Sequence, residues 1–251
     1  QMSASETIKD YKLMWKSLAV FALTPSGFLA HSLIGVEVAF IALAGAGADV
    51  LFLPDVASMY PEGFQTAVTV DRVTRGLCGA GRPTHFRGVT TVVAKLFNAV
   101  QPDVAVFGQK DLQQVLVINR MISDLQFPIE LVVAPTVREA DGLAMSSRNR
   151  RLDAAARAIA LSLPRGLEKA NRAFKLGETS SPALTTILAE EVLLNEGTEV
   201  DYADVVRLSG FVDSEIADDG CVLAGAIFVG GVRLIDHVKL GGPAIPVALD
   251  D

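Results

Sequence analysis

Apolar residues in the middle of the chain follow two alternating spacings, one typical of buried strands and one typical of helices. Short, mainly apolar runs predict strands at 48–54, 103–108 and 129–135. Apolar residues at helical spacing predict helices at 88–100 and 110–125. Strands that alternate with helices indicate a parallel sheet covered by helices, so we predict an α/β fold for this part of the chain.

The pattern changes after residue 153. It predicts two helices and then three β-rich runs, at residues 154–176, 182–194, 200–208, 221–229 and 232–240. Gly230 and Gly231 separate the last two runs and are typical of a tight hairpin turn. Helices followed by a meander predict a small α+β domain. We therefore place a first domain at residues 1–136 and a second at 137–251.

Composition limits the class of protein. Half of the 251 residues are hydrophobic and 20% are charged, so a sizeable core is expected. The formal net charge of −7 argues against general nucleic-acid binding, which needs a basic face. Cys78 and Cys221 lie far apart and indicate a reducing compartment rather than a disulfide framework. We expect no signal peptide and a cytoplasmic location.

The apolar segment 18–53 needs a separate test for a membrane span. Pro25, His31, Glu37 and Asp49 interrupt it, so we expect buried strands and a core helix, and no membrane partner.

The spacing of the histidines does not indicate a metal site. The three histidines, His31, His85 and His237, show no metal-ligand spacing, so we predict no metal-binding residues. His85 is interpreted as a structural hydrogen-bonding residue.

The stretch "FGQKDLQQ" (107–114) lies where a predicted parallel strand ends and a helix begins. Ligands bind at this edge of open α/β sheets. Gly108 allows close approach of the backbone, and Lys110 near a helix N-terminus favours an anion. Lys110 is otherwise an ordinary surface lysine, and Gln113 and Gln114 are otherwise simply solvated.

A second stretch, "READGLAMSSRNR" (138–150), lies between the predicted domains. Its two serine hydroxyls and its guanidinium groups suit phosphate oxygens, so it is either an anion clamp or a solvated loop. A third stretch, "CGAGRPTHFRGV" (78–89), is interpreted as a glycine-rich loop that enters a helix, with only a weak indication of phosphate binding.

Four long stretches together resemble the pantothenate synthetase (pantoate–β-alanine ligase) family. They are "MYPEG", "LCGAGRPTHFRGV", "VVAKLFNAVQPDVAVFGQKDLQQ" and "PTVREADGLAMSSRNRRL". The resemblance implies a Rossmann-like nucleotidyl-transferase domain, a small C-terminal α+β lid domain and a homodimer. It also implies ATP-dependent condensation of pantoate with β-alanine through pantoyl adenylate, with release of AMP and pyrophosphate and with Mg²⁺ accompanying ATP. The product, pantothenate, feeds coenzyme A biosynthesis.

The resemblance assigns three catalytic residues, Lys110, Arg148 and His31. Lys110 would contact the ATP phosphates and stabilise charge that builds at the α-phosphate. Ser146 and Arg148 would hold the phosphates, with Ser147 beside them.

The remaining implied contacts are to other parts of the substrates. Asp111 and the backbone of Gly108 would hold the ribose, and the backbone of Val137 would contact adenine. Met145 belongs to the same ATP-binding set, and Gln114 would hydrogen-bond pantoate.

The N-terminal part departs from the family pattern. Family members carry a "PTMGALHEGH"-like stretch, whereas the nearest match here is "TPSGFLAHSLIG" (24–35). Only His31 remains of the histidine pair, either as a phosphate ligand or as a histidine without a role in the site. A strand and loop of the "FVNPxQF" type is also not visible. The alternative function is therefore a catalytically impaired ATP-binding or dimerising relative.

Overall fold

The computed structural model describes residue 50 and residues 52–242. The contacts between residues divide the chain into two compact units. Of the described residues, the first contains those up to Val70 together with His85–Gly108 and Ile118–Ala134; the second contains Asp71–Thr84, Gln109–Val117 and those from Pro135 onward. The sequence places the domain boundary at 136/137, close to the last of these breaks. It does not anticipate that two earlier segments group with the C-terminal part.

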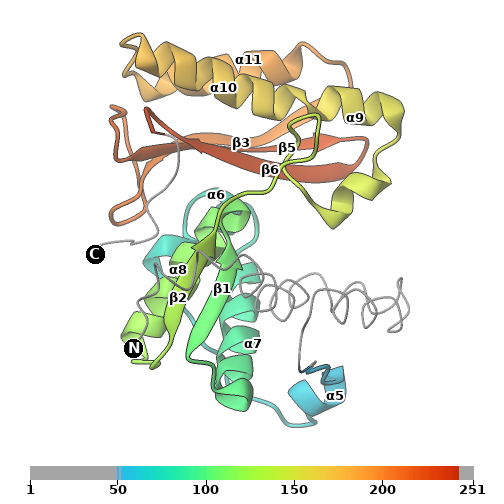
Figure 1. Cartoon of the computed structure of the whole chain (residues 1–251), viewed down its shortest axis with the longest axis vertical. Coiled ribbons are helices and arrows are strands. Elements are labelled where there is room, and N and C mark those ends of the chain that lie inside the picture. The colour runs from blue at the N-terminus through green and yellow to red at the C-terminus, as the bar shows by residue number, and fades with distance from the viewer. Residues whose placement is uncertain (1–49, 51, 243–251) are drawn as a thin grey trace. The chain divides into compact units, whose positions relative to one another are not determined.

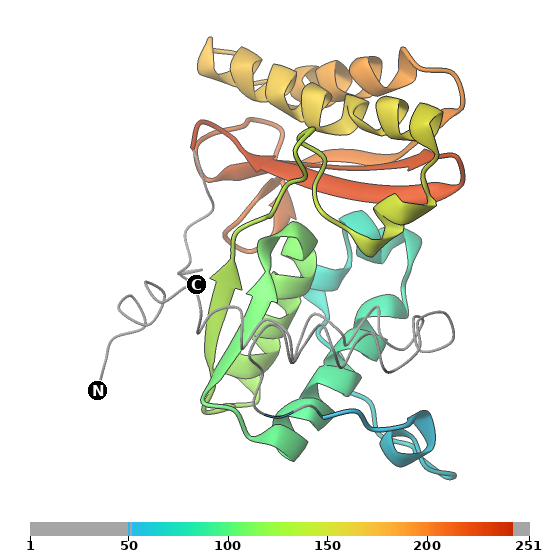
Figure 2. The ribbon, with the colours of Figure 1, turned by 45° about the vertical axis from the view of Figure 1, so that its right-hand side comes forward.

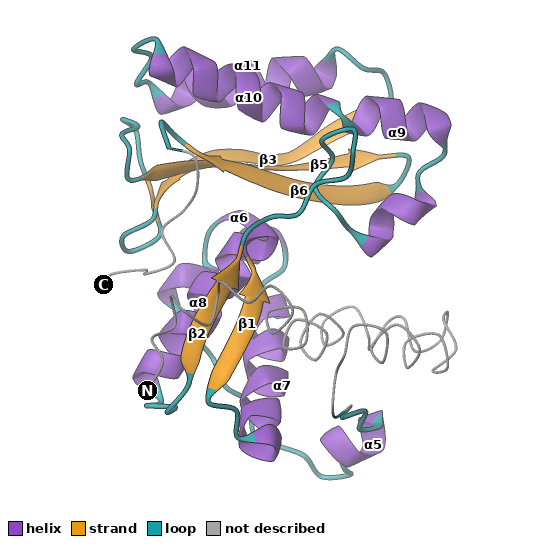
Figure 3. Ribbon diagram, viewed as in Figure 1, coloured by secondary structure: helices purple, strands orange, loops and turns teal. Residues whose placement is uncertain are grey.

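The first unit contains a two-stranded parallel sheet. Strand β1 (Val104–Gly108) pairs in register with β2 (Glu130–Ala134), from Val104 opposite Glu130 to Gly108 opposite Ala134 (Figure 1, Figure 3). Helix α8 (Leu112–Asp124) connects the two strands, and α7 (His85–Val100) precedes them. The parallel pair with its connecting helix confirms the predicted α/β class.

The predicted strand at 48–54 is not found in the part of it that the structure describes. Residue 50 and residues 52–54 form no strand, and Val50, Phe52 and Leu53 are exposed. No strand pairs with this run in the described part of the chain, and an apolar run without a neighbouring strand has no backbone partners for its N–H and C=O groups. A short helix, α5 (Val56–Met59), follows it directly.

The second unit is built on an antiparallel sheet in the order β4-β3-β5-β6. The strands are β3 (Thr198–Arg207), β4 (Val212–Asp213), β5 (Cys221–Val229) and β6 (Val232–Lys239). Three helices lie over one face of the sheet in both views: α9 (Ala154–Ala160), α10 (Ser162–Lys175) and α11 (Ser181–Leu193) (Figure 1, Figure 2). The predicted meander and its separation from the first sheet are confirmed.

The turn between β5 and β6 has the predicted form. Val229 pairs with Val232, so Gly230 and Gly231 alone form the loop. Their φ values are +54° and +72°, in the left-handed region that a type I′ hairpin turn requires at both positions.

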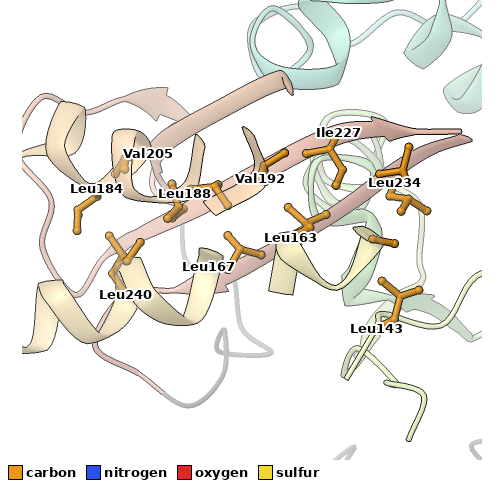
Figure 4. Close-up of a cluster of buried hydrophobic side chains, with 14 of the residues drawn as sticks. Leu143, Leu163, Leu167, Leu184, Leu188, Val192, Val205, Ile227, Leu234 and Leu240 are labelled. Atoms are coloured by element: carbon orange, nitrogen blue, oxygen red, sulfur yellow. The ribbon is translucent and has the colours of Figure 1, made fainter. Parts of the chain in front are cut away.

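Strand β5 is buried on both faces. On one face Leu223 and Ile227 belong to a core with Leu163 of α10 and Leu188 of α11. Figure 4 shows Ile227, Leu163 and Leu188 in this core. On the other face Val222 and Ala224 pack with three leucines from segments much earlier in the chain, Leu77, Leu112 and Leu116. Successive strand residues point to opposite faces of the sheet. The early segments therefore cover the face of β5 that is opposite α10 and α11, and so form part of the second unit.

The glycine-rich stretch 78–89 is largely helical rather than a loop. It contains most of α6 (Leu77–Gly81) and the start of α7. A Cβ atom at Gly79 would lie 1.7 Å from the Thr74 carbonyl oxygen, in the short helix η1 (Arg72–Thr74). Only a residue without a Cβ atom therefore fits at position 79.

None of the helices in the described residues is long and apolar enough to cross a membrane.

Candidate active site

The two polar stretches singled out in the sequence meet within the second unit. Lys110 lies in η2 (Gln109–Asp111), directly after β1. Its Nζ atom donates a hydrogen bond to the Met145 carbonyl oxygen at 3.3 Å, across 35 residues of sequence. Lys110, two residues before α8, is thereby next to the "MSSRN" segment.

The charge environment of Lys110 is mixed. Burial lowers the pKa of its ammonium group, and the nearby Arg148 and Arg138 lower it further. Asp111 and Asp236 act in the opposite direction. Burial and neighbouring cations disfavour a positive charge, so an anion bound beside Lys110 would stabilise it.

Residues 137–145 form a small folded hairpin. The Met145 N–H donates to the Val137 carbonyl at 2.9 Å, and the Glu139 N–H donates to the Leu143 carbonyl at 2.8 Å. Leu143 is buried in the main core of the second unit. The segment is therefore anchored in the core at Leu143, while most of its other side chains are exposed.

The hairpin leads into η3 (Ser147–Arg151). The Ser146 hydroxyl caps this helix by accepting a hydrogen bond from the Arg148 N–H at 3.2 Å, and its own O–H remains a donor. Ser147 and Arg148 are exposed, whereas Asn149 is buried. One buried amide thus fixes a turn whose hydroxyl and guanidinium groups face solvent.

Carboxylates at the start of the hairpin are paired with Arg157 of α9. The guanidinium group contacts Glu139 and Asp141, the latter at 2.8 Å. The pKa of Glu139 is lowered by a hydrogen bond from Asn149 and then by Arg157, and the pKa of Asp141 is lowered mainly by Arg157. Both carboxylates are therefore held in the charged form.

A second ion pair joins the hairpin to β6. Arg138 donates to the two carboxylate oxygens of Asp236 at 2.6 and 3.1 Å. The Asp236 side chain is 2% exposed. The next residue, His237, is buried, and β6 lies against η2, whose Lys110 backbone opposes the lowering of the His237 pKa. Sequence reasoning missed this pair, and the only available signal was the polar dipeptide inside the apolar run "VRLIDHVKL".

The two glutamines of α8 differ. Gln113 is 6% exposed, and its Nε2 group donates to the carbonyls of Val73 at 3.0 Å and Gly76 at 2.8 Å. The interpretation of Gln113 as solvated is therefore wrong, because its amide ties α8 to the η1–α6 segment. Gln114 is half-buried, and Asp111 is exposed.

Two predicted site residues remain, Gly108 and His31. Gly108 ends β1, and a Cβ atom built there would meet no atom within 4 Å. His31 lies outside the described residues. Within the described residues, no group of three or more His, Cys, Asp or Glu side chains could hold a metal ion.

Comparison with known proteins gives a consistent result. The family model for pantoate-beta-alanine ligase matches residues 38–239. Pantothenate synthetase from Moorella thermoacetica is 50% identical over 197 residues, which cover 78% of this chain and 70% of that protein. The enzyme of the same name from Citrifermentans bemidjiense is 49% identical over 198 residues, covering 79% and 71%.

Solved structures agree. Pantothenate synthetase from Thermus thermophilus has 40% sequence identity and a TM-score of 0.78, covering 82% of this chain and 75% of that one. Pantoate-beta-alanine ligase from Francisella tularensis, complexed with beta-gamma ATP and beta-alanine, has 27% identity and a TM-score of 0.65, covering 84% and 72%.

The fold, the anchored polar hairpin and these relatives define an enzyme of the ligase class. The chain belongs to the pantoate-beta-alanine ligase family. The resemblance identified from the sequence and the predicted fold class are confirmed. The family match begins at residue 38, so His31 and the divergent stretch 24–35 precede it.

Proposed function

We propose that this chain condenses pantoate with β-alanine at the expense of ATP. The pantoate carboxylate attacks the α-phosphorus of ATP and displaces pyrophosphate, which leaves pantoyl adenylate. The β-alanine amine then attacks the acyl carbon and releases AMP and pantothenate. The observation that carries the proposal is the 3.3 Å contact between Lys110 Nζ and the Met145 carbonyl, because it joins two groups of phosphate-suited residues.

The ATP phosphates would be bound by Lys110, Ser146, Ser147 and Arg148. The exposed Arg148 guanidinium and the two serine hydroxyls supply donors, and Lys110 supplies a second positive charge. Adenylation needs little covalent work from side chains, so fixed charge and positioning would dominate the rate enhancement.

Other residues would bind the rest of the substrates. Asp111 and the Gly108 backbone would hold the ribose, and Val137 and Met145 would contact the adenosine part of ATP. The open space beside Gly108 supports this role, because a backbone without Cβ allows close approach. Gln114 would hydrogen-bond pantoate, and His31 would assist at the phosphates.

Mg²⁺ would arrive with ATP rather than in a protein cage. Mg²⁺ is commonly held by substrate phosphates together with only one or two carboxylates, and bound in this way it would neutralise phosphate charge. The proposal also includes a homodimer and a cytoplasmic location; the free thiols Cys78 and Cys221 fit a reducing compartment.

The comparisons do not favour the alternative of a catalytically impaired relative, because the similar proteins carry the name pantothenate synthetase. The deciding measurement is AMP and pantothenate formation by the purified chain with ATP, Mg²⁺, pantoate and β-alanine. We expect AMP release to need both pantoate and β-alanine for full turnover. No AMP or pantothenate above background would contradict the proposal.

Variants make the assay specific. Lys110→Ala should lower kcat/KM by about 10²–10³-fold, the usual loss for one preorganised donor. Lys175→Ala, an exposed lysine on α10, serves as the control and should stay within about twofold of the unmodified chain. Calorimetry should show weakened ATP binding in the Lys110→Ala/Arg148→Ala double variant.

A further inference from the structure

Two adjacent residues of β6 contact the two segments of the proposed site. Asp236 binds Arg138 at the start of the 137–145 hairpin, and β6, which carries the buried His237, lies against η2, which carries Lys110. Neither residue belongs to the polar stretches from which the proposed phosphate ligands come. Both contacts lie within the second unit.

The two side chains lie on opposite faces of the sheet. Leu234 belongs to the core beneath α10 and α11, and Asp236, two residues later, shares its face. His237 pairs with Ala224 of β5, which belongs to the opposite core with Leu112. Because directly paired strand residues share a face, His237 lies on the side of Leu112. The hairpin and the Lys110 turn therefore contact β6 from its two faces.

Asp236 is a buried carboxylate that requires hydrogen-bond partners. Its carboxylate is 2% exposed and accepts three hydrogen bonds, two from Arg138 and one from the His237 N–H at 2.8 Å. A buried carboxylate must keep such partners, because an unpaired buried charge is strongly unfavourable. Arg138 also donates to the Gly142 carbonyl at 3.1 Å, so its guanidinium group holds both sides of the hairpin turn.

His237 supplies the second connection. Its side chain is buried, and β6 lies against η2, the turn that carries Lys110 and precedes α8. Strand β6 pairs with β5 without a register shift from Val222 opposite Lys239 to Val229 opposite Val232. The two connections thus start from one regular strand, one on each face.

We propose that Asp236 and His237 are positioning residues for the ligase reaction. Asp236 holds the 137–145 hairpin through Arg138, and His237 holds the Lys110 turn. Strand β6 thereby sets the distance between Lys110 and the Ser146–Arg148 segment. This role rests on the proposed function, since it concerns the geometry of the same phosphate site. Misplacement of a positioned group by about 1 Å typically costs about 10²-fold in rate.

The first test measures geometry without substrates. Hydrogen exchange of the amides in 137–149 and 109–112 is followed in the full chain and in Asp236→Asn. The matched control is Asp201→Asn, which breaks another arginine–carboxylate pair that involves β6, Arg233–Asp201 at 2.6 Å. We expect exchange in 137–149 to accelerate at least tenfold in Asp236→Asn and to stay within twofold in Asp201→Asn. Equal effects of the two variants would overturn the proposal.

The second test measures catalysis. Asp236→Asn should lower kcat by 10–100-fold while KM for β-alanine stays within twofold, and Asp201→Asn should leave both within twofold. His237→Leu removes the polar ring beside η2 and should accelerate exchange in 109–112, whereas His237→Gln keeps a polar side chain and should retain more of kcat. Equal kcat in the two His237 variants would overturn its positioning role.

The two proposals fail in different ways. If the unmodified chain makes no pantothenate, the proposed function fails, while the exchange measurement still decides whether β6 fixes the two segments. If Asp236→Asn does not fold, Arg138→Gln repeats the test from the side chain that is 39% exposed. Unchanged exchange in 137–149 of Arg138→Gln would overturn the proposal.

Discussion

The side-chain amide of Asn149 donates a hydrogen bond to the Glu139 carboxylate at 2.5 Å and so joins the two ends of the segment that carries Ser146 and Arg148. The same amide donates to the Ala144 carbonyl at 3.1 Å. Asn149 is 4% exposed, so water does not easily replace these bonds. The conformation of the exposed donors therefore depends on a residue that faces the interior.

Asn149→Asp should weaken ATP binding by about tenfold or more, about 1.4 kcal/mol. The substitution keeps the shape of the side chain but places two carboxylates in contact, and one buried hydrogen bond is worth about 1–3 kcal/mol. Adding Glu139→Gln should recover part of the affinity, because the new amide can donate to the carboxylate introduced at position 149. Calorimetric titration with ATP measures both effects; equal affinities in all three proteins would contradict the prediction.

His237 should make the stability of the protein depend on pH. Burial is the main cause that lowers its pKa below the ordinary value of 6.5; Asp236 and the Lys110 backbone oppose the shift, while Arg138 lowers the pKa further. As pH falls through 6.5, the unfolded chain binds a proton that the folded chain resists. The free energy of unfolding should therefore fall on acidification.

The measurement is urea unfolding at about pH 7.5 and about pH 5.5, on either side of the usual histidine pKa. His237→Gln cannot take up this proton, so its free energy of unfolding should fall less between the two pH values than that of the unmodified chain. Parallel losses in the two proteins would show that His237 does not cause the pH dependence.

Gly79→Ala should destabilise the protein by about 1–3 kcal/mol or more, the usual cost of overpacking. The added Cβ would lie 1.7 Å from the Thr74 carbonyl oxygen, which is backbone and cannot move independently. Gly81→Ala is the matched control in the same helix, because its Cβ would meet no atom within 4 Å. Thermal unfolding of both variants tests the steric requirement, and similar melting temperatures would refute it.

Local patterns predicted most of the regular structure. The apolar runs at 103–108 and 129–135 contain β1 and β2, and the glycine pair at 230–231 forms the expected turn. These features depend on nearby residues, which a single sequence displays. In the run at 48–54 the described residues form no strand, because an apolar stretch does not reveal whether a partner strand exists.

The site was only partly predictable for the same reason. Lys110 and the "MSSRN" segment were recognisable because each belongs to a compact motif. The Arg138–Asp236 pair joins residues 98 positions apart, and the burial of Gln113 depends on the carbonyls of Val73 and Gly76. Such partners are chosen by the tertiary fold, so spacing along the chain gives no signal for them.

The two-sided burial of β5 also has a consequence for synthesis on the ribosome. Leu77 and Leu112 need Val222 and Ala224 to cover them, yet Val222 is made about 110 residues after Leu112, roughly 5 to 20 s later at typical elongation rates. During that interval the emerging chain carries apolar segments without their native cover. The nascent protein should therefore depend on chaperones most strongly before β5 leaves the exit tunnel.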